Sequence, residues 1–226
     1  MSSSCRPEEL LACTIARLIG DARHVAVGAA SPIPAAGAFL RREKNRDLRI
    51  SLLQKRKGNP FTEGSRELFD LAGQGRIDVF FLGGAQIDAQ GNINLVRAEG
   101  RRFPGSFGSA FMYQAVPNVI LFREEHSRRV LVPQVEFVSA AGKPKALLTG
   151  KALFGFDKRF VLKSFHPGES VESIRASTGF EFEVAQGIKE TQSPTMEELG
   201  LLRGPVRKRI AADYPDFANR VWGLTS

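Results

Sequence analysis

The chain has 226 residues and a formal net charge of +8, with 42% hydrophobic and 25% charged residues, the composition of an ordinary globular protein. A chain of this length is able to bury a sizeable core as a single domain. No apolar run approaches the ~20 residues that span a bilayer, and the N-terminus lacks a secretory signal, so we expect a cytoplasmic protein with no membrane partner. The basic excess comes without a nucleic-acid-binding motif, so we expect no nucleic-acid partner and interpret much of it as solvated surface.

The first half of the chain alternates predicted helices with predicted strands. An amphipathic pattern predicts a helix over 7–19, and Ser31 is expected to cap a second helix that runs toward residue 42. A third helix is expected at 65–72, and strands are expected at 24–29, 48–53 and 77–82, with a basic loop at 54–64. This alternation is typical of a parallel or mixed sheet with helices on both faces.

The second half is richer in predicted strands. They are expected at 118–123, 129–132, 135–138, 146–148, 152–156 and 160–165. Helices are expected at 171–176 and 195–203, and residues 206–212 are a candidate extension beyond Pro205. The sequence therefore predicts an α/β fold, a single open-sheet domain over residues 1–226 with a strand-rich second half.

The cysteines and histidines give no metal-binding pattern. Cys5 and Cys13 are not spaced with other cysteines or histidines as ligands, and a structural disulfide is not expected in a cytoplasmic chain. We interpret Cys13 as a small core residue of the first helix. His126, in a charged segment between strands, is interpreted as exposed surface. We therefore expect no metal site.

Two glycine loops are the most informative feature of the sequence. Gly83 and Gly84 follow the predicted strand 77–82, at the strand end where open α/β sheets bind ligands. A second loop, Gly105-Ser106-Phe107-Gly108, precedes a short predicted helix over 109–115. Two such loops are able to cradle an anion or a thioester oxygen with main-chain N–H groups. The alternative, that the glycines only make turns, is the commoner role of an isolated Gly-Gly pair.

Several short motifs follow one another along nearly the whole chain. They are GGAQID at 83–88, GNIN at 91–94, FPGS at 103–106, RRV at 128–130, VEFVS at 135–139, SFHPG at 164–168, STGF at 177–180 and PTMEEL at 194–199. Each is weak alone, but their shared order resembles the β subunits of family I CoA-transferases, of which glutaconate CoA-transferase is a type. The chain also resembles the β subunit of the steroid ring-opening CoA hydrolases.

The resemblance implies the open CoA-transferase (NagB/RpiA-like) fold, and an α-type partner subunit in a heterodimer or heterotetramer. It implies an acyl-CoA thioester as substrate, no tightly bound cofactor, and a structural role for His166. Some of the basic residues are candidates for steering the phosphates of CoA. The backbone expected to line the acyl-CoA site is that of Gly83, Gly84, Ala85, Gly105, Ser106, Phe107 and Gly108.

The position that the resemblance assigns to the catalytic nucleophile is Gln54. In the family, a Glu carboxylate at the end of the second strand attacks the acyl-CoA, and CoA thiolate then converts the resulting anhydride into a glutamyl thioester. A carboxamide is a very poor nucleophile, which leaves three interpretations. The α subunit supplies the carboxylate, as in the ring-opening hydrolases; or Glu63 substitutes, although stabilisation of a helix N-terminus is its preferred role; or the subunit is purely structural.

The second glycine loop also departs from the family pattern. Phe107 stands where the transferases have a glycine in the loop expected to face the acyl-CoA. Its ring there would crowd a small dicarboxylate or contact an apolar acyl group. Inward packing of the ring is the equally weighted alternative, because apolar residues dominate cores as well as pockets.

Overall fold

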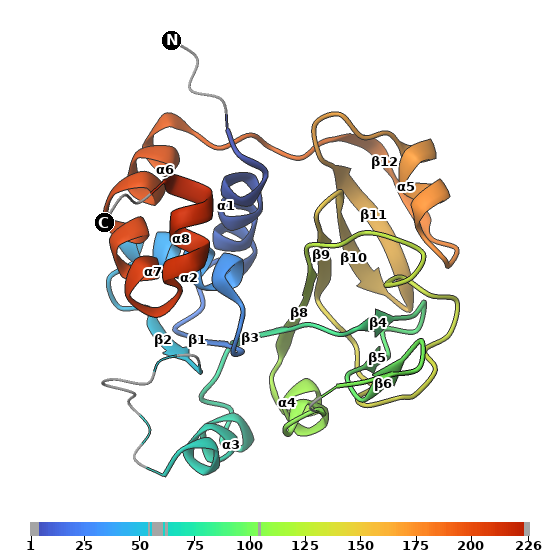
Figure 1. The fold of residues 1–226 in the computed structure, drawn as a ribbon, viewed down its shortest axis with the longest axis horizontal. Coiled ribbons are helices and arrows are strands. Elements are labelled where there is room, and N and C mark those ends of the chain that lie inside the picture. Colours follow the sequence, from blue (N-terminus) through green and yellow to red (C-terminus); the bar gives the residue numbers. More distant parts are fainter. Residues whose placement is uncertain (1–4, 54, 56–60, 62, 104, 224–226) are drawn as a thin grey trace. The chain divides into compact units, whose positions relative to one another are not determined.

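The computed structural model describes residues 5–53, 55, 61, 63–103 and 105–223 (Figure 1). The chain groups into two compact units. One unit contains residues 1–67, 77–79 and 192–226, and the other contains residues 68–76 and 80–191. The expectation that residues 1–226 form a single domain stays a prediction.

The first unit opens with α1 (Pro7–Ile19), whose bounds agree with the predicted helix. Proline in the first turn suits the start of a helix, because its missing N–H has no partner there in any case. The middle of α1 is buried on all sides, from Glu9 to Ala16, and Leu11, Cys13 and Ile15 are at most 2% exposed. The interpretation of Cys13 as a core residue is therefore confirmed.

Two parallel strands flank the second helix of this unit. β1 (His24–Val27) pairs in parallel with β2 (Arg49–Leu52), and α2 (Pro32–Lys44) connects them. The predicted cap of α2 is wrong. The Ser31 hydroxyl donates to the carbonyl oxygen of Ala29 at 3.1 Å and makes no capping bond to the helix.

Buried carboxylates join α1 to the C-terminal segment. The side chain of Glu9 is fully buried, and it accepts two hydrogen bonds of 2.7 Å from the Arg203 guanidinium and one of 3.1 Å from the Trp222 indole. Glu198 accepts a 2.7 Å hydrogen bond from Arg17 in the same way. A buried carboxylate needs such a charge-assisted partner, so these pairs fix which helices lie together.

The C-terminal segment is a run of helices interrupted at Pro205. α6 (Met196–Leu201) passes into a π-helical turn, η1 (Leu202–Val206), and then into α7 (Arg207–Asp213). Proline lacks the N–H of a regular helix and its ring clashes with the preceding turn, and a local widening relieves this conflict. A last helix that the sequence did not predict, α8 (Pro215–Trp222), follows.

The second unit is built on a mixed sheet. β3 (Val79–Leu82) starts in the first unit and continues into the second. The strands of this unit are hydrogen-bonded in the order β12-β11-β10-β9-β8-β3. β8 pairs in parallel with β9, β10 is antiparallel to both β9 and β11, and β11 is parallel to β12. The bounds are β8 (Asn118–Arg123), β9 (Ala146–Thr149), β10 (Ala152–Asp157), β11 (Arg159–Phe165) and β12 (Glu183–Glu190).

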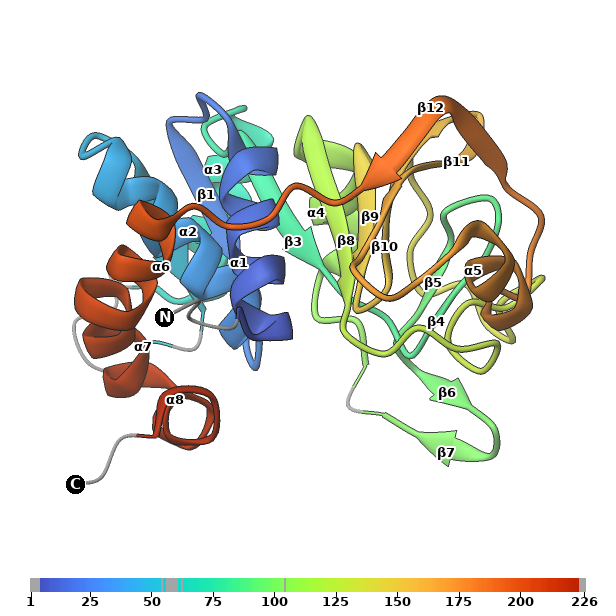
Figure 2. The ribbon, with the colours of Figure 1, turned by 90° about the horizontal axis from the view of Figure 1, so that it is seen from above.

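Short helices and two hairpins complete this unit. The hairpins are β4 (Gln86–Ile87) with β5 (Ile93–Asn94), and β6 (Arg97–Ala98) with β7 (Arg101–Arg102), and Figure 2 shows the β6/β7 hairpin extending away from β4 and β5. The helices are α3 (Ser65–Gly73), of which residues 68–73 belong here, α4 (Ser109–Ala115) and α5 (Val171–Ser177). The predicted α/β class and the helix at 109–115 are confirmed.

Two strand predictions between β8 and β9 are wrong. Residues 129–132 and 135–138 are irregular: the first segment makes one isolated bridge, Leu131 with Ile87, and the next bridge, Ala140 with Ile93, lies just beyond the second segment. The β4/β5 hairpin that they contact has two residues in each strand, which is too short for a further strand to pair with it over several residues. Conversely, β12 was not predicted, because much of it is exposed and its sequence lacks an apolar alternation.

Candidate functional site

The predicted nucleophile position follows the end of β2. β2 ends at Leu52, and the N–H of Leu53 donates to the carbonyl of Val27 at 3.0 Å, so the chain leaves the sheet at the carboxyl end of β1 and β2. Gln54 itself lies outside the described residues. Glu63, the alternative acid, has a side chain that is 66% exposed and lies 3.5 Å from the Arg66 guanidinium. A solvated, ion-paired carboxylate ahead of α3 fits the helix N-terminus better than it fits a desolvated nucleophile.

The Gly83-Gly84 loop has a steric reason for its glycines. Neither residue has a left-handed φ, so unusual dihedrals are not what requires glycine here. A Cβ on Gly84 would lie 2.8 Å from the carbonyl oxygen of Gln86 and 3.3 Å from Cβ of Ile93. A Cβ on Gly83 would lie 3.1 Å from the carbonyl oxygen of Phe122. Gly84 therefore lets the β4/β5 hairpin fold tightly against the end of β3, and Gly83 lets the backbone of β8 come close.

Ala85 is committed to the same hairpin. Its N–H donates to the carbonyl of Asn94 at 2.8 Å, so this main-chain donor is already used within the protein. The interpretation of the first glycine loop as a turn thus accounts for Gly84 and Ala85 locally. A ligand role for this loop remains a proposal.

Polar residues of the motif form a buried amide network inside the hairpin. Gln86 and Asn94 are at most 4% exposed, and the Asn94 amide donates to the Gln86 carbonyl oxygen at 2.9 Å. The Gln86 amide donates to the Glu136 carboxylate at 2.8 Å. That carboxylate also accepts the N–H of Glu99 at 3.0 Å, and these hydrogen bonds hold the pKa of Glu136 below its usual value.

A second buried carboxylate organises the turn of the hairpin. Asp88 is fully buried and accepts the N–H groups of Gln90 and Asn92 at 3.0 Å and that of Val135 at 3.3 Å. Main-chain donors of this kind satisfy an ionised carboxylate without a cation. Gln86, Asp88 and Asn94 of the motif are therefore scaffold residues, a role that their sequence pattern does not indicate.

The second glycine loop has an unusual backbone. Gly105, Phe107 and Gly108 all have positive φ, at +110°, +39° and +68°. The value at Phe107 is the notable one, because a left-handed conformation is uncommon and costly for a bulky residue. A Cβ on Gly108 would lie 2.3 Å from the Phe69 ring, so glycine there lets this ring pack directly on the loop backbone.

The side chain of Phe107 points to solvent. It is 68% exposed, so the alternative of inward packing is wrong. Its ring centroid lies 6.1 Å from that of Phe69, which in turn lies 5.9 Å from that of Phe111, itself 46% exposed. Phe107 of the loop, Phe69 of α3 and Phe111 of α4 therefore form one aromatic surface.

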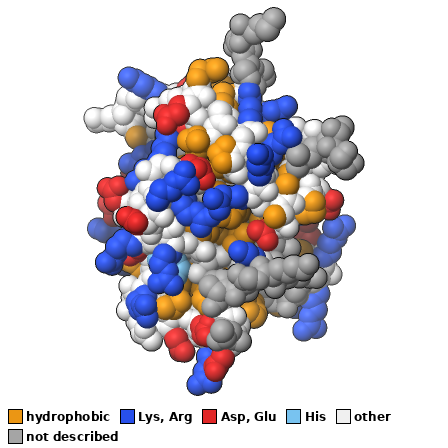
Figure 3. Space-filling model, turned by 90° about the vertical axis from the view of Figure 1, so that its left-hand side faces the viewer, with side chains coloured by type: hydrophobic (Ala, Val, Ile, Leu, Met, Phe, Trp, Pro, Cys, Tyr) orange, Lys and Arg blue, Asp and Glu red, His pale blue; other side chains and the backbone are white. Residues whose placement is uncertain are grey.

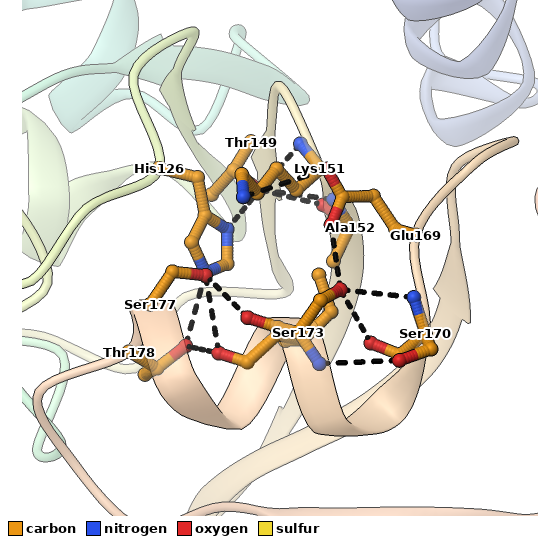
Figure 4. Close-up of polar contacts among 10 residues, drawn as sticks. His126, Thr149, Lys151, Ala152, Glu169, Ser170, Ser173, Ser177 and Thr178 are labelled. Carbon is orange, nitrogen blue, oxygen red and sulfur yellow. Dashed lines mark hydrogen bonds and ion pairs between the residues drawn. The ribbon is translucent and has the colours of Figure 1, made fainter.

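His126 is buried, which corrects the prediction of an exposed residue. Its Nδ1 is 2.8 Å from the Thr149 hydroxyl and its Nε2 is 3.0 Å from the Thr178 hydroxyl (Figure 4). Burial, reinforced by the charge of Lys151, lowers the pKa of His126 to about 4. Both ring nitrogens are occupied, so this histidine is a neutral structural residue.

His166 is also buried and hydrogen-bonded at both nitrogens. Nδ1 lies 2.8 Å from the Thr191 hydroxyl and Nε2 lies 2.9 Å from the carbonyl oxygen of Thr149. Burial lowers its pKa as well. This geometry agrees with the predicted structural role.

Basic residues on the helices of the first unit are interleaved with acidic ones. Figure 3 views the molecule from the left-hand side of Figure 1 and shows blue (Lys, Arg) side chains beside red (Asp, Glu) ones. Glu43, whose side chain is 5% exposed, lies 2.9 Å from Arg46 and 3.7 Å from Arg209. Lys44 lies 3.6 Å from Glu198. These positive charges are compensated by partners of the same unit.

The part of the chain that the structure describes offers neither a metal centre nor a membrane-spanning helix. Its His, Cys, Asp and Glu residues do not gather in a group of three or more that could hold a metal ion. No helix among those residues is long and apolar enough to cross a membrane.

The family model described as "Coenzyme A transferase" matches residues 9–174, which is more than half of the chain. The chain therefore belongs to the coenzyme A transferase family, and the resemblance seen in the sequence is confirmed.

Individual relatives agree with this assignment. One subunit of the 3-oxoadipate CoA-transferase from Pseudomonas knackmussii is 30% identical over 162 residues, which cover 61% of this chain and 62% of that protein. The β subunit of an acetate CoA-transferase from Haemophilus influenzae is 30% identical over 129 residues, which cover 55% of this chain and 58% of that protein. The chain matches less than two thirds of the length of these curated relatives.

Solved structures match over a longer span. A chain of the decarboxylase AibA/AibB is 26% identical with a TM-score of 0.78, covering 98% of this chain and 100% of that one. Glutaconate coenzyme A-transferase from Acidaminococcus fermentans has a TM-score of 0.77 at 22% identity, covering 89% of this chain and 95% of that one, and shows the same fold.

Proposed function

We propose that this chain is the β-type subunit of a heteromeric CoA-transferase-like enzyme that acts on acyl-CoA thioesters. The family match over residues 9–174 carries the proposal, and the similarity to the β subunit of an acetate CoA-transferase supports the β-type assignment. The partner is an α-type subunit, in a heterodimer or heterotetramer. The CoA thioester is a substrate, and no tightly bound cofactor is required.

The proposal assigns the missing nucleophile to the partner. Gln54 stands at the position of the family's Glu, and a carboxamide does not attack a thioester or form a glutamyl-CoA intermediate. Glu63 is solvated and lies beside Arg66, which is a poor environment for a nucleophilic carboxylate. The isolated chain is therefore inactive as a transferase, and an α-subunit carboxylate performs the chemistry.

The loops of this chain line the acyl-CoA in the proposed complex. They are Gly83, Gly84 and Ala85 at the carboxyl end of β3, and Gly105, Ser106, Phe107 and Gly108 ahead of α4. The second loop has the stronger support, because left-handed backbone at a bulky residue is typical of functional loops and the Phe107 ring is exposed. The ring would contact an apolar acyl group rather than a small dicarboxylate.

A second candidate is a lyase or hydrolase that breaks a C–C bond of an acyl-CoA. Two observations favour it: the Gln54 substitution, and the match of AibA/AibB, a decarboxylase, over 98% of this chain. Ring opening of a cyclic acyl-CoA with a carboxylate on α belongs to the same class. A non-catalytic subunit that stabilises an α partner is the third candidate.

Activity assays on the assembled protein separate these candidates. The chain is co-expressed with the α-type subunit encoded beside it, and acyl-CoA consumption is followed with and without an acceptor carboxylate. Acceptor-dependent formation of a new CoA thioester supports the transferase. Conversion of the substrate into a different CoA thioester without an acceptor, and without release of free CoA, supports the C–C bond chemistry. No acyl-CoA binding by the folded complex contradicts the enzymatic proposal and leaves the structural role.

Gln54→Glu is the matched variant for this assay. The two side chains are nearly isosteric, so a position beside an accessible cleft tolerates the change. At a buried site the carboxylate would instead cost about several kcal/mol or have a raised pKa. A large loss of thermal stability would show that Gln54 is a core residue and that its alignment with the nucleophile is wrong.

A further inference from the structure

The β6/β7 hairpin carries two arginines in direct cross-strand register. Arg97 pairs with Arg102, and Ala98 pairs with Arg101. Residues opposite each other in an antiparallel pair project from the same face with their Cβ atoms about 5 Å apart, and like charges there are destabilising. Arg97 and Arg102 therefore lie side by side on one face, and Arg101 lies on the other. All three arginines are exposed.

The nearby acids have other direct partners, and the charge of Arg97 acts on Glu136 only as the weakest of the causes that lower the pKa of that carboxyl. The Glu99 carboxylate lies 3.7 Å from Arg129, and the Glu136 carboxylate accepts hydrogen bonds from the Glu99 N–H and the Gln86 amide. Among the described residues, no carboxylate lies within 4.0 Å of the guanidinium groups of Arg97 or Arg102. This differs from the first unit, where the Glu43 carboxylate lies 2.9 Å from Arg46 and 3.7 Å from Arg209.

The buried amide network of Gln86 and Asn94 holds the β6/β7 hairpin in place. The Asn94 side-chain oxygen accepts the N–H groups of Val96 at 3.1 Å and Arg97 at 3.3 Å, and its amide donates to the Arg97 carbonyl. The N–H of Phe103 donates to the Val96 carbonyl at 2.8 Å and closes the hairpin at its base. Hydrogen bonds from the buried Asn94 side chain therefore fix the backbone that carries Arg97 and Arg102. A preorganised pair of cations without an ion-paired acid is suited to an anionic ligand.

We propose that Arg97 and Arg102 bind the phosphate groups of coenzyme A. Planar guanidinium groups match phosphate oxygens with two-pronged hydrogen bonds, and a phosphate between them relieves their mutual repulsion. The inference rests on the proposed acyl-CoA substrate and names the subsite for its nucleotide end. The hairpin leads into the glycine loop, and the five residues from Arg102 to Phe107 span at most about 17 Å. The extended pantetheine arm of one CoA molecule bridges such a span between phosphates and acyl group.

Arg102 and its neighbour Arg101 make a matched pair for the test. Arg102→Gln and Arg101→Gln remove the same charge from adjacent exposed positions. Only Arg102 lies on the hairpin face that also carries Arg97. Each variant of the αβ complex is titrated with an acyl-CoA and with the matching acyl-pantetheine, which lacks the phosphates. We expect Arg102→Gln to raise the Kd of the acyl-CoA about tenfold or more and to leave that of the acyl-pantetheine unchanged. Arg101→Gln should change both by no more than about twofold.

Thermal unfolding of the complexes serves as the folding control. Arg102→Gln removes a like-charge contact, so its Tm should equal or exceed that of the wild type. An unchanged acyl-CoA affinity of Arg102→Gln would overturn the proposed phosphate subsite. Equal losses of affinity in the two variants would overturn it as well, because they would indicate general electrostatic steering rather than binding at one site. Failure of Arg102→Gln to co-purify with its α-type partner would overturn it too, by assigning the pair to the subunit interface. A wild-type complex that binds neither ligand contradicts the proposed function itself.

Discussion

Replacing Phe107 by glycine tests the acyl-binding role of the second loop. The side chain is 68% exposed, so of the roughly 200 Å² of an aromatic side chain about 140 Å² is open for contact. A ligand that covers half of this area gains about 2 kcal/mol at ~25 cal/mol per Å², or about thirtyfold in Kd. Phe107→Gly should therefore weaken binding of an apolar, ring-bearing acyl-CoA by this factor.

The same substitution should leave the folded protein almost as stable as the wild type. Glycine relieves the left-handed backbone at φ +39°, which costs about 1–2 kcal/mol for a residue with a side chain. Against this stand about 0.5–1 kcal/mol of extra backbone entropy in the unfolded chain and a similar amount for the lost contact with Phe69. The net change should stay within about 1 kcal/mol, whereas truncating a core phenylalanine costs about 3–5 kcal/mol.

Calorimetric titration and urea unfolding of the αβ complex measure both effects. The ligands are one ring-bearing acyl-CoA and one small dicarboxylyl-CoA, and the control is Phe137→Ala, which removes a 44% exposed phenylalanine outside the loop. The reasoning is refuted if Phe107→Gly lowers affinity for both ligands equally. A stability loss of several kcal/mol would show that the ring is part of the core.

Two further predictions concern stability. Gly84→Ala should destabilise the protein by about 1–3 kcal/mol in urea unfolding, because the new Cβ would lie 2.8 Å from the Gln86 carbonyl oxygen. The control is Gly200→Ala in α6, where a Cβ has no neighbour within 4 Å and the change should be neutral or stabilising. Equal effects of the two substitutions would contradict the steric account. Because burial lowers the pKa of His126 to about 4 from its usual 6.5, the unfolded chain binds more protons between these values, and stability should fall by up to about 3 kcal/mol as pH drops from 6.5 to 4. His166 adds to the same trend, and a flat pH profile in this window would show that these histidines are not buried neutral.

Regular elements with a strong pattern were predictable from the sequence. The apolar residues of α1 and the proline and glycine at its ends lie within one short stretch of sequence, so its bounds agree with the prediction. The failures arise where tertiary contacts decide. The apolar residues of 129–138 suggest strands, but their neighbour is a two-residue hairpin that offers isolated bridges. The exposed strand β12 has no pattern to detect, because it is held through pairing with β11.

The candidate site also combines features that the local sequence predicts with features that depend on tertiary contacts. The glycine loops were identified from the sequence, but the reason for Gly84 is the packing of Ile93 and Gln86 against it, which no local rule reveals. His126 has charged neighbours in the sequence, whereas its hydrogen-bond partners Thr149 and Thr178 lie 23 and 52 residues away. The exposure of Phe107 likewise required the structure.

The most direct test of the account is the location of any covalent CoA adduct. The αβ complex is incubated with its acyl-CoA substrate and treated with borohydride, which reduces a glutamyl thioester, and both polypeptides are then examined by mass spectrometry. The account predicts an unmodified chain here, because Gln54 cannot form the thioester, while acyl-CoA turnover by the complex is retained. A reduced glutamyl residue on any Glu of this chain would contradict the assignment of the chemistry to the partner.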